Sequence, residues 1–366
     1  MSAQLHDRIV QAIADADGWL PFDRFMAIAL YEPGLGYYSR GGTIFGALPA
    51  SGSDFITAPE LSPLFGRTLA RPVAQALVAA GADTVYEFGA GTGALAAQLL
   101  GALGERVRRY AIVDVSGTLR QRQAETLAPW ADRVCWLNHW PDTLHGVVIG
   151  NEVLDAMPVQ LLHWDGTQWL ERGVAAVEGT LGWADRATAL RPPATGAADA
   201  DALPSTLPPG TVTEIHPQAE AFIRTLAARL QRGAAFFIDY GFPESEYYHP
   251  QRSQGTLMCH RAHRSDDQPL VDVGDKDITA HVNFSAIALA AQDAGLDVLG
   301  YTSQARFLLN CGLLELLQGA DLRSIAPAQK LINEHEMGEL FKVIALGRGI
   351  DAAGLGFDAG DRSHML

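Results

Sequence analysis

One short segment constrains the fold of this chain more than any other. Residues 85–93 have the sequence VYEFGAGTG, in which a short strand-like run leads directly into three glycines at alternate positions. Residues 94–103 follow with mostly Ala and Leu, a composition typical of a buried helix. A strand, a glycine turn and a helix are the start of many open α/β folds, in which backbone amides at the helix start bind a ligand.

The glycine turn is compatible with two kinds of ligand. Residues 89–94 match the dinucleotide pattern G-x-G-x-x-G/A, and with Glu87 the segment also matches E-x-G-x-G-x-G, the pattern of S-adenosylmethionine (SAM) sites. Asp114 ends the next predicted strand, where its carboxylate can accept hydrogen bonds from ribose hydroxyls. Both ligands carry a ribose, so Asp114 does not separate them.

Glu87 favours SAM over a dinucleotide. A carboxylate two positions before the first glycine opposes a pyrophosphate, but it suits the ammonium and sulfonium groups of SAM. We therefore predict a SAM site whose loop comprises Gly89, Ala90, Gly91 and Gly93. The alternatives are another nucleotide, or a glycine turn that holds no ligand.

Strands and helices alternate along most of the chain, which predicts an α/β fold with a mostly parallel sheet covered on both faces. With 366 residues, the chain can form one large domain with insertions, or two domains. Seven strands are predicted, at residues 84–89, 110–115, 134–137, 146–150, 234–240, 296–302 and 341–346. Helices are predicted between them, at residues 94–103, 118–127, 216–230, 284–294 and 305–333.

The remaining segments are predicted to surround this core. Residues 1–30 have helical periodicity, and the Gly-, Pro- and Tyr-rich residues 31–66 form either a lid over a site or an ordered loop on the sheet edge. Apolar and polar residues alternate over 159–183 around an Asp-Gly turn, which predicts an inserted β-hairpin. We thus expect four parts: N-terminal helices and lid at 1–80, the core at 81–158 and 211–348, the hairpin and a flexible loop at 159–210, and a loose tail at 349–366.

A second polar segment follows the fourth predicted strand. Residues 148–158 have the sequence VIGNEVLDAMP, and ligands of open α/β sheets lie beyond the carboxyl ends of strands. Asn151 and Glu152 are therefore expected beside the glycine loop. A helical turn would place Glu152 and Asp155 on one side, where two carboxylates could bind a guanidinium and stabilise its developing charge. The alternative is that Asp155 caps a helix and Glu152 is solvated.

Composition indicates which classes of partner and which cellular compartment to expect. Three cysteines lie far apart without metal-ligand spacing, so we expect reduced thiols, no metal and a cytoplasmic location. The formal net charge of −15 disfavours nucleic acid and favours a cationic target. We find no apolar run long enough to span a membrane and no signal sequence. The oligomeric state stays open.

Several motifs together resemble one family. The segments YEPGLGYYS, DFITAPELSPLFG, EFGAGTG, NEVLDAMPV, FFIDYG, DITAHVNF and MGELFKVIALGR occur in this order. They are similar to those of the MidA-type SAM-dependent methyltransferases, the family of a mitochondrial complex I assembly factor that symmetrically dimethylates an arginine. The resemblance covers about residues 5–348.

The resemblance implies a class I methyltransferase (Rossmann-like) sheet of seven strands with an antiparallel last strand. By matching motif, it implies that the glycine loop and Glu87 line SAM, that Asp114 holds the ribose, and that Asn151 and Glu152 face the methyl-transfer site. Thr57, Pro59 and Glu60 would belong to a covering loop.

Four other polar residues, three of them in the motifs, are also considered. Asn283 stands where the family has an aspartate, which removes the charge from that position. His281 is either catalytic or a helix-start or core residue, and His216 is interpreted as structural. Asp239 either shapes a pocket or caps a turn.

The function predicted from these features is methyl transfer from SAM to a protein arginine guanidinium, with S-adenosyl-homocysteine (SAH) as product. Family analogy suggests a respiratory complex I subunit as the protein substrate. The alternatives are a methyltransferase of small O- or N-nucleophiles, a SAM-binding assembly factor without turnover, and an NAD-dependent oxidoreductase.

Overall fold

The structure, a computed structural model, describes residues 2–40, 56–114, 117–193, 207–318, 322–351 and 353–366. The predicted lid residues 41–55 and the loop residues 194–206 lie outside the described residues. The chain divides into two compact units. The first comprises Met1–Gly42, Asp155–Glu220 and Phe242–Ala286, and the second comprises Thr43–Leu154, Ala221–Gly241 and Ile287–Leu366. Of the predicted N-terminal part at 1–80, the residues up to Gly42 thus cluster with the inserted segment, and residues 58–80 cluster with the predicted core.

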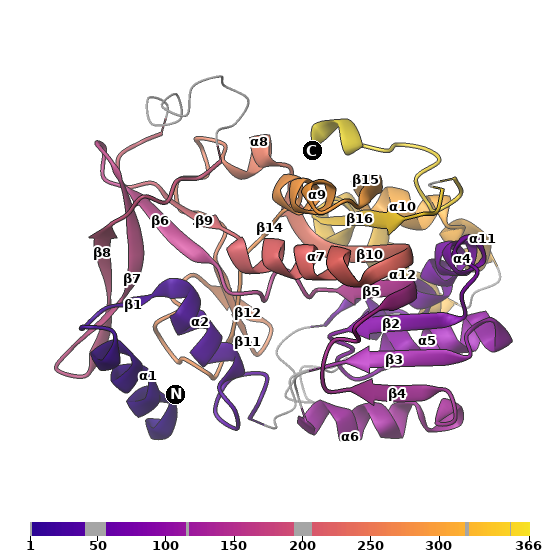
Figure 1. The fold of residues 1–366 in the computed structure, drawn as a ribbon, viewed down its shortest axis with the longest axis horizontal. Helices are drawn as coiled ribbons and strands as arrows, with labels where there is room; N and C mark the ends of the chain where they lie inside the picture. The colour runs from indigo at the N-terminus through magenta and orange to yellow at the C-terminus, as the bar shows by residue number, and fades with distance from the viewer. Residues whose placement is uncertain (1, 41–55, 115–116, 194–206, 319–321, 352) are drawn as a thin grey trace. The chain divides into compact units, whose positions relative to one another are not determined.

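The main sheet follows the order β15-β16-β10-β5-β2-β3-β4. In Figure 1, β5, β2, β3 and β4 lie side by side. The strands are β2 (Thr84–Phe88), β3 (Arg109–Val113), β4 (Val134–Leu137), β5 (Leu144–Asn151), β10 (Leu230–Phe242), β15 (Asp297–Ser303) and β16 (Phe341–Arg348). The five strands from β10 to β4 are parallel, and β16 is antiparallel to both of its neighbours. The mostly parallel sheet and its antiparallel last strand are confirmed.

A strand lies at each of the seven predicted positions, but the sheet has eight strands. The eighth is β14 (Val282–Asn283), which at two residues is too short to give a periodic signal. The central strands are apolar without alternation, because both faces are covered. Val147, Val148 and Ile149 of β5 have no exposed surface, and neither do the four residues 234–237 of β10.

Helices with clear end signals cover this sheet. Helix α4 (Pro63–Ala80) begins where the Ser62 side chain accepts a hydrogen bond from Leu64 N, and it ends at Gly81, whose φ is +66°. Helix α4 packs with α5 (Ala94–Leu103). Further helices of this part of the chain are α3 (Ala58–Leu61), α6 (Gly117–Thr126), α7 (Pro217–Arg229), α9 (Phe284–Asp293), α10 (Gln304–Asn310), α11 (Leu313–Gln318) and α12 (Leu322–Ile332). The predicted helical stretch at 305–333 is therefore three helices, the first two separated at Cys311 and Gly312.

The first unit contains a five-stranded antiparallel sheet where a hairpin was predicted. Its order is β1-β7-β6-β9, and β8 pairs with β7. The strands are β1 (Leu20–Pro21), β6 (Gln160–Trp164), β7 (Trp169–Val177), β8 (Thr180–Ala187) and β9 (Val212–Ile215). The predicted hairpin is β6–β7, and its turn forms at Asp165, which accepts hydrogen bonds from Thr167 N and Gln168 N. Sequence patterns missed three of these strands. β1 and β9 are too short to alternate visibly, and β8 extends the predicted hairpin to a third strand that ends at Ala187.

Short elements complete the first unit. Helices α1 (Ala3–Asp15) and α2 (Phe22–Tyr31) confirm the predicted N-terminal helices. A small sheet of β12-β11-β13 was not predicted. It consists of β11 (Met258–Arg261), β12 (Arg264–Asp266) and β13 (Asp277–Thr279). The turn between β11 and β12 places Ala262 and His263 at positive φ without glycine, so it carries no turn signature in the sequence.

The prediction of a loose C-terminal tail is wrong. Leu355 and Phe357 are buried, and the Phe357 ring centroid lies 5.3 Å from that of Phe307 in α10. The Asn310 side chain donates hydrogen bonds to the carbonyls of Gly356 and Ala359. Gly- and Asp-rich composition suggested a solvated chain end, but two apolar side chains and these backbone contacts fix it to the core.

Replacing Phe357 with alanine should therefore destabilise the protein by about 3 kcal/mol, because a buried aromatic ring leaves a cavity. Urea unfolding measures this difference. Val78→Ala, at a side chain that is exposed in α4, should change the free energy of unfolding by less than about 0.5 kcal/mol. Equal stability of Phe357→Ala and the wild type would show that the tail does not support the fold.

Candidate functional site

The loop between β2 and α5 requires its three glycines. Gly89, Gly91 and Gly93 have φ values of +65°, +53° and +84°, a backbone region that is unfavourable for residues with a Cβ. A Cβ at Gly89 would also lie 3.0 Å from the Val153 side chain. The loop therefore exposes backbone to close approach, and helix α5 begins directly after Gly93.

Strand register brings the predicted site residues to one edge of the sheet. Phe88 of β2 pairs with Val113 of β3 and with Gly150 of β5. The next residues along these strands are Gly89, Asp114 and Asn151. Because the three strands are parallel, these residues lie together at the carboxyl ends. Glu87, the glycine loop, Asp114, Asn151 and Glu152 all belong to the second unit, whereas Asp155 belongs to the first.

The described part of the predicted covering loop is attached to the glycine loop. Thr57 is the N-cap residue of the short helix α3 (Ala58–Leu61). Glu60 accepts a hydrogen bond from the Thr92 hydroxyl, between the second and third glycines. Gln98 of α5 donates to the Pro59 carbonyl at 2.8 Å. These contacts hold residues 57–61 against the loop and the start of α5.

Glu87 is a buried carboxylate at the end of β2. Only 2% of its surface is exposed, and the Tyr110 hydroxyl donates a hydrogen bond of 2.6 Å to its Oε2. Burial raises the pKa of Glu87 to about 7, the Tyr110 bond opposes this rise, and the charge of Asp114 adds to it. Near neutral pH the carboxyl is therefore ready to ionise when a cation binds beside it.

Asp114 is held by a residue that sequence reasoning missed. Gln123 in α6 donates from Nε2 to Asp114 Oδ2 at 2.8 Å and to the Gly91 carbonyl at 3.0 Å. Its Oε1 accepts from Trp136 Nε1 at 2.8 Å. No pattern in the sequence distinguishes Gln123 from the exposed glutamine two residues before it.

The turn after β5 differs from the predicted helical turn. Residues 152–158 contain no helix, and Glu152 has a φ of +54°, which is unfavourable for a residue with a side chain. Glu152 N donates to the Ile238 carbonyl at 2.9 Å, and Asn151 Nδ2 donates to Glu152 Oε1 at 3.0 Å. Hydrogen bonds thus hold both the backbone and the side-chain carboxylate of Glu152.

Asp239 stabilises this turn. It is fully buried, and its Oδ2 accepts hydrogen bonds from Val153 N at 3.2 Å and Leu154 N at 2.9 Å. Of its two predicted roles, the structure supports the capping of a turn. Asp155 caps no helix. It is 5% exposed in the first unit, where its carbonyl accepts a hydrogen bond from Ala280 N.

His216 and the motif residue His281 both lie in the first unit. His216 is buried and shares a hydrogen bond of 3.0 Å with the Tyr247 hydroxyl, which in turn donates to Glu214. Burial, with a contribution from His281, lowers the pKa of His216 to about 4, so it is neutral and structural as interpreted. The His281 ring stacks on Phe242 with centroids 5.2 Å apart, and α9 begins only at Phe284.

The site presents mainly hydrogen-bond acceptors. Glu87 and Asp114 supply carboxylates, and Asn151 Oδ1 is buried without a hydrogen-bond partner among the described residues. A buried acceptor of this kind suits a ligand that brings its own donors. Ammonium and hydroxyl groups match this set, whereas a pyrophosphate would face like charge from Glu87. The residues present therefore fit SAM.

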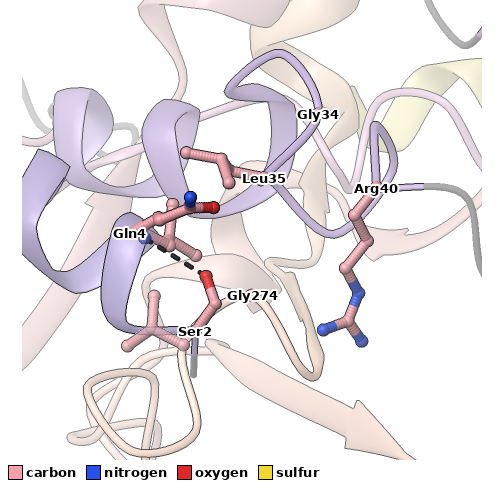
Figure 2. A pocket seen from close by; sticks show the side chains of 8 residues that line it. Ser2, Gln4, Gly34, Leu35, Arg40 and Gly274 are labelled. Carbon is pink, nitrogen blue, oxygen red and sulfur yellow. Dashed lines mark hydrogen bonds between the residues drawn. The ribbon is translucent and has the colours of Figure 1, made fainter.

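A separate cavity in the first unit contains none of the predicted site residues. It has a volume of about 190 Å³ and is lined by Ser2, Gln4, Leu5, Gly34, Leu35, Arg40, Val273 and Gly274 (Figure 2). Ser2 within it accepts a hydrogen bond from Leu5 N as the cap of α1, and Arg40 forms an ion pair with Asp275. These polar groups therefore already have partners within the unit.

Comparison with known proteins gives one consistent family. A profile of the SAM-dependent methyltransferases matches residues 68–302. A protein from Burkholderia thailandensis, solved with bound SAH, is 55% identical with a TM-score of 0.93. That match covers 99% of this chain and 96% of the other. A native structure from the same organism is 54% identical with a TM-score of 0.88, at the same coverage.

More distant relatives carry a substrate in their names. The mitochondrial protein arginine methyltransferase NDUFAF7 of Danio rerio is 26% identical over 398 residues, which covers 94% of this chain and 88% of that protein. Its Homo sapiens counterpart is 27% identical over 373 residues, at 88% and 78% coverage. Within the described residues, no helix combines the length and apolarity needed to cross a bilayer.

Glu87→Gln should stabilise the ligand-free protein above pH 7. The wild-type carboxyl has a higher pKa folded than unfolded, so its proton favours the folded state at low pH, and this stability is lost between pH 4.5 and about 7. Glutamine keeps an acceptor for Tyr110 without the charge. Thermal unfolding at pH 5 and pH 8 should show a gain in the variant that grows with pH. Glu125→Gln, at an exposed position of α6, is the control and should show no gain in stability that grows with pH. A pH-independent gain in Glu87→Gln would contradict this account.

Proposed function

Because this chain belongs to the SAM-dependent methyltransferase family and uses SAM as its cofactor, we propose that it methylates the guanidinium of a protein arginine. The observation that carries the proposal is Glu152, a carboxylate held at positive φ next to the edge where the glycine loop and Asp114 lie. The arginine methyltransferases among its relatives, which match along most of its length, support this choice of acceptor.

In this proposal the second unit holds the cofactor. The loop of Gly89, Ala90, Gly91 and Gly93 supplies backbone that the ligand can approach closely, and Asp114 accepts from the ribose hydroxyls. Glu87 and Asn151 Oδ1 accept from the ammonium group. Thr57 and Pro59 lie on the segment that covers the loop. When bound, SAM supplies an electrophilic methyl group on its sulfonium, and the product is SAH.

Glu152 would orient the acceptor. A carboxylate can accept two parallel N–H bonds from one guanidinium, which fixes the plane of that group and directs its remaining nitrogen towards the methyl. The carboxylate also stabilises the positive charge and can take the proton that the substituted nitrogen releases. Asn151 holds one Glu152 oxygen, so the orientation exists before the substrate binds.

Charge and thiol chemistry suggest the setting. A net charge of −15 would attract a cationic, arginine-bearing segment. Cys135, Cys259 and Cys311 are free thiols, which suits a reducing compartment such as the cytoplasm. By family analogy, a subunit of respiratory complex I is the proposed substrate.

SAH should bind the purified protein in calorimetry, and Glu152→Gln should retain that affinity while methylation of arginine peptides falls by a factor of about 100 or more. The amide keeps the shape of the side chain but removes its charge. Asp297→Asn, at an exposed residue of β15, is the matched control. Full activity in Glu152→Gln would remove this residue from the mechanism, and failure of SAH to bind would overturn the proposed site.

The acceptor class is tested separately. Tritiated SAM is offered with arginine peptides, with lysine peptides and with a set of small alcohols and amines, and mass spectrometry locates the label. Label on arginine alone is the expected result. Label only on small molecules would overturn the protein substrate. Complex I subunits from cells with and without this protein should differ by methyl masses on arginine if the target assignment is correct.

A further inference from the structure

We propose that Gln123 is a positioning residue of the cofactor site, which fixes the Asp114 carboxylate and the glycine loop through a single buried amide. This inference rests on the proposed function in one respect, the assignment of Asp114 to the ribose. It adds a residue that belongs to no recognised motif of the chain.

The geometry links two separate parts of the site. Gln123 has no exposed surface and lies on α6, the helix that follows Asp114 in the chain. One Nε2 hydrogen goes to Asp114 Oδ2 and the other to the Gly91 carbonyl, at 2.8 and 3.0 Å. A Cβ at Gly93 would lie 3.5 Å from the Gln123 Cα, so α6 also packs directly against the loop.

The third bond determines which way the amide points. The indole nitrogen of Trp136 can only donate, so the atom that faces it at 2.8 Å must be the amide oxygen. The Gly91 carbonyl can only accept, and an ionised Asp114 carboxylate also only accepts, so both must face the amide nitrogen. Each of the three partners therefore requires the same orientation, and a flipped amide would lose all three bonds.

A neutral donor is the suitable partner for Asp114. A lysine or arginine in this position would form an ion pair with the carboxylate and compete with ribose hydroxyls for its charge. An amide fixes the rotation of the carboxylate and leaves its negative charge intact. The same amide holds the Gly91 carbonyl, so the loop and the carboxylate keep a constant spacing, which a ligand that contacts both requires.

Gln123→Leu should weaken SAH binding by about tenfold to a hundredfold, because it removes the amide that donates to both Asp114 and the Gly91 carbonyl in a partly buried site. The turnover rate at saturating SAM should change by no more than a few-fold, since the hydrogen bonds of Gln123 do not involve Glu152, the residue proposed to bind the methyl acceptor. Gln121→Leu, on the exposed face of the same helix, should bind SAH like the wild type. Calorimetry and steady-state kinetics give these values. Unchanged SAH affinity in Gln123→Leu would overturn the proposal.

Gln123→Glu provides a readout that a purely structural role would not change. At pH 8 its carboxylate would face Asp114 and the Gly91 carbonyl, and binding should be weak. At pH 5.5 the added carboxyl can be protonated, and its O–H can donate to Asp114 while its other oxygen accepts from Trp136. The ratio of variant to wild-type SAH affinity should therefore recover at least several-fold at low pH. The ratio is needed because Glu87, an acidic group near Asp114, titrates in the same range. A ratio independent of pH would overturn the donor role.

Asp114→Ala separates this inference from the proposed function. If Asp114→Ala binds SAH like the wild type, the ribose assignment fails, and the positioning role of Gln123 fails with it. If Asp114→Ala loses affinity and Gln123→Leu does not, only the role of Gln123 is overturned. If both lose affinity, the double variant should lose less than the product of the two single effects, because Gln123 acts partly through Asp114. Independent, multiplying effects would contradict the proposed coupling.

Melting temperatures show whether each variant is folded, and recovery of SAH affinity by Gln123→Glu at low pH tests the role of this residue in a second variant.

Discussion

The parallel pairing of β2 with β3 on one side and β5 on the other is the interaction on which the site depends. The register that pairs Phe88 with both Val113 and Gly150 places the next residue of each strand at the same edge. A glycine turn, a carboxylate and an amide therefore meet there, although Asn151 comes 62 positions after Gly89 in the sequence. A shift of one residue in either pairing would move Asp114 or Asn151 to the opposite face of the sheet.

The site also concentrates groups that are unfavourable for stability. Glu87 is a carboxyl buried among strands, Glu152 has a positive φ, and Asn151 Oδ1 is a buried acceptor without a protein partner among the described residues. Each costs on the order of 1 kcal/mol or more in the ligand-free protein. The surrounding apolar strands and helices offset these costs. The three unfavourable groups lie together at one edge of the sheet, and this arrangement fits a ligand that supplies positive charge and hydrogen-bond donors.

Sequence reasoning succeeded where a residue type has one physical explanation. Three alternate glycines after a strand require an unusual backbone, and the structure places all three at positive φ. It failed where the explanation depends on distant partners. Gln123 becomes significant only when α6 brings it between Gly91 and Asp114, and Phe357 only when α10 supplies a ring for it to pack against. The turn at Glu152 was predicted as helical because nothing local shows that Asp239, 87 residues later, accepts its amides.

Asp239 explains why the turn that carries Glu152, on the side of the site proposed to bind arginine, can be rigid without being a helix or a strand. Amides of a turn that are not in a helix or strand need partners, and here one buried carboxylate oxygen accepts two of them. This leaves the Glu152 backbone with little freedom, and Asn151 restricts its side chain. A carboxylate that is fixed before substrate binds loses less entropy when a planar guanidinium engages it. The same reasoning applies to Gln123 on the cofactor side, so both halves of the site are positioned by neutral or buried groups that need not contact the reacting atoms.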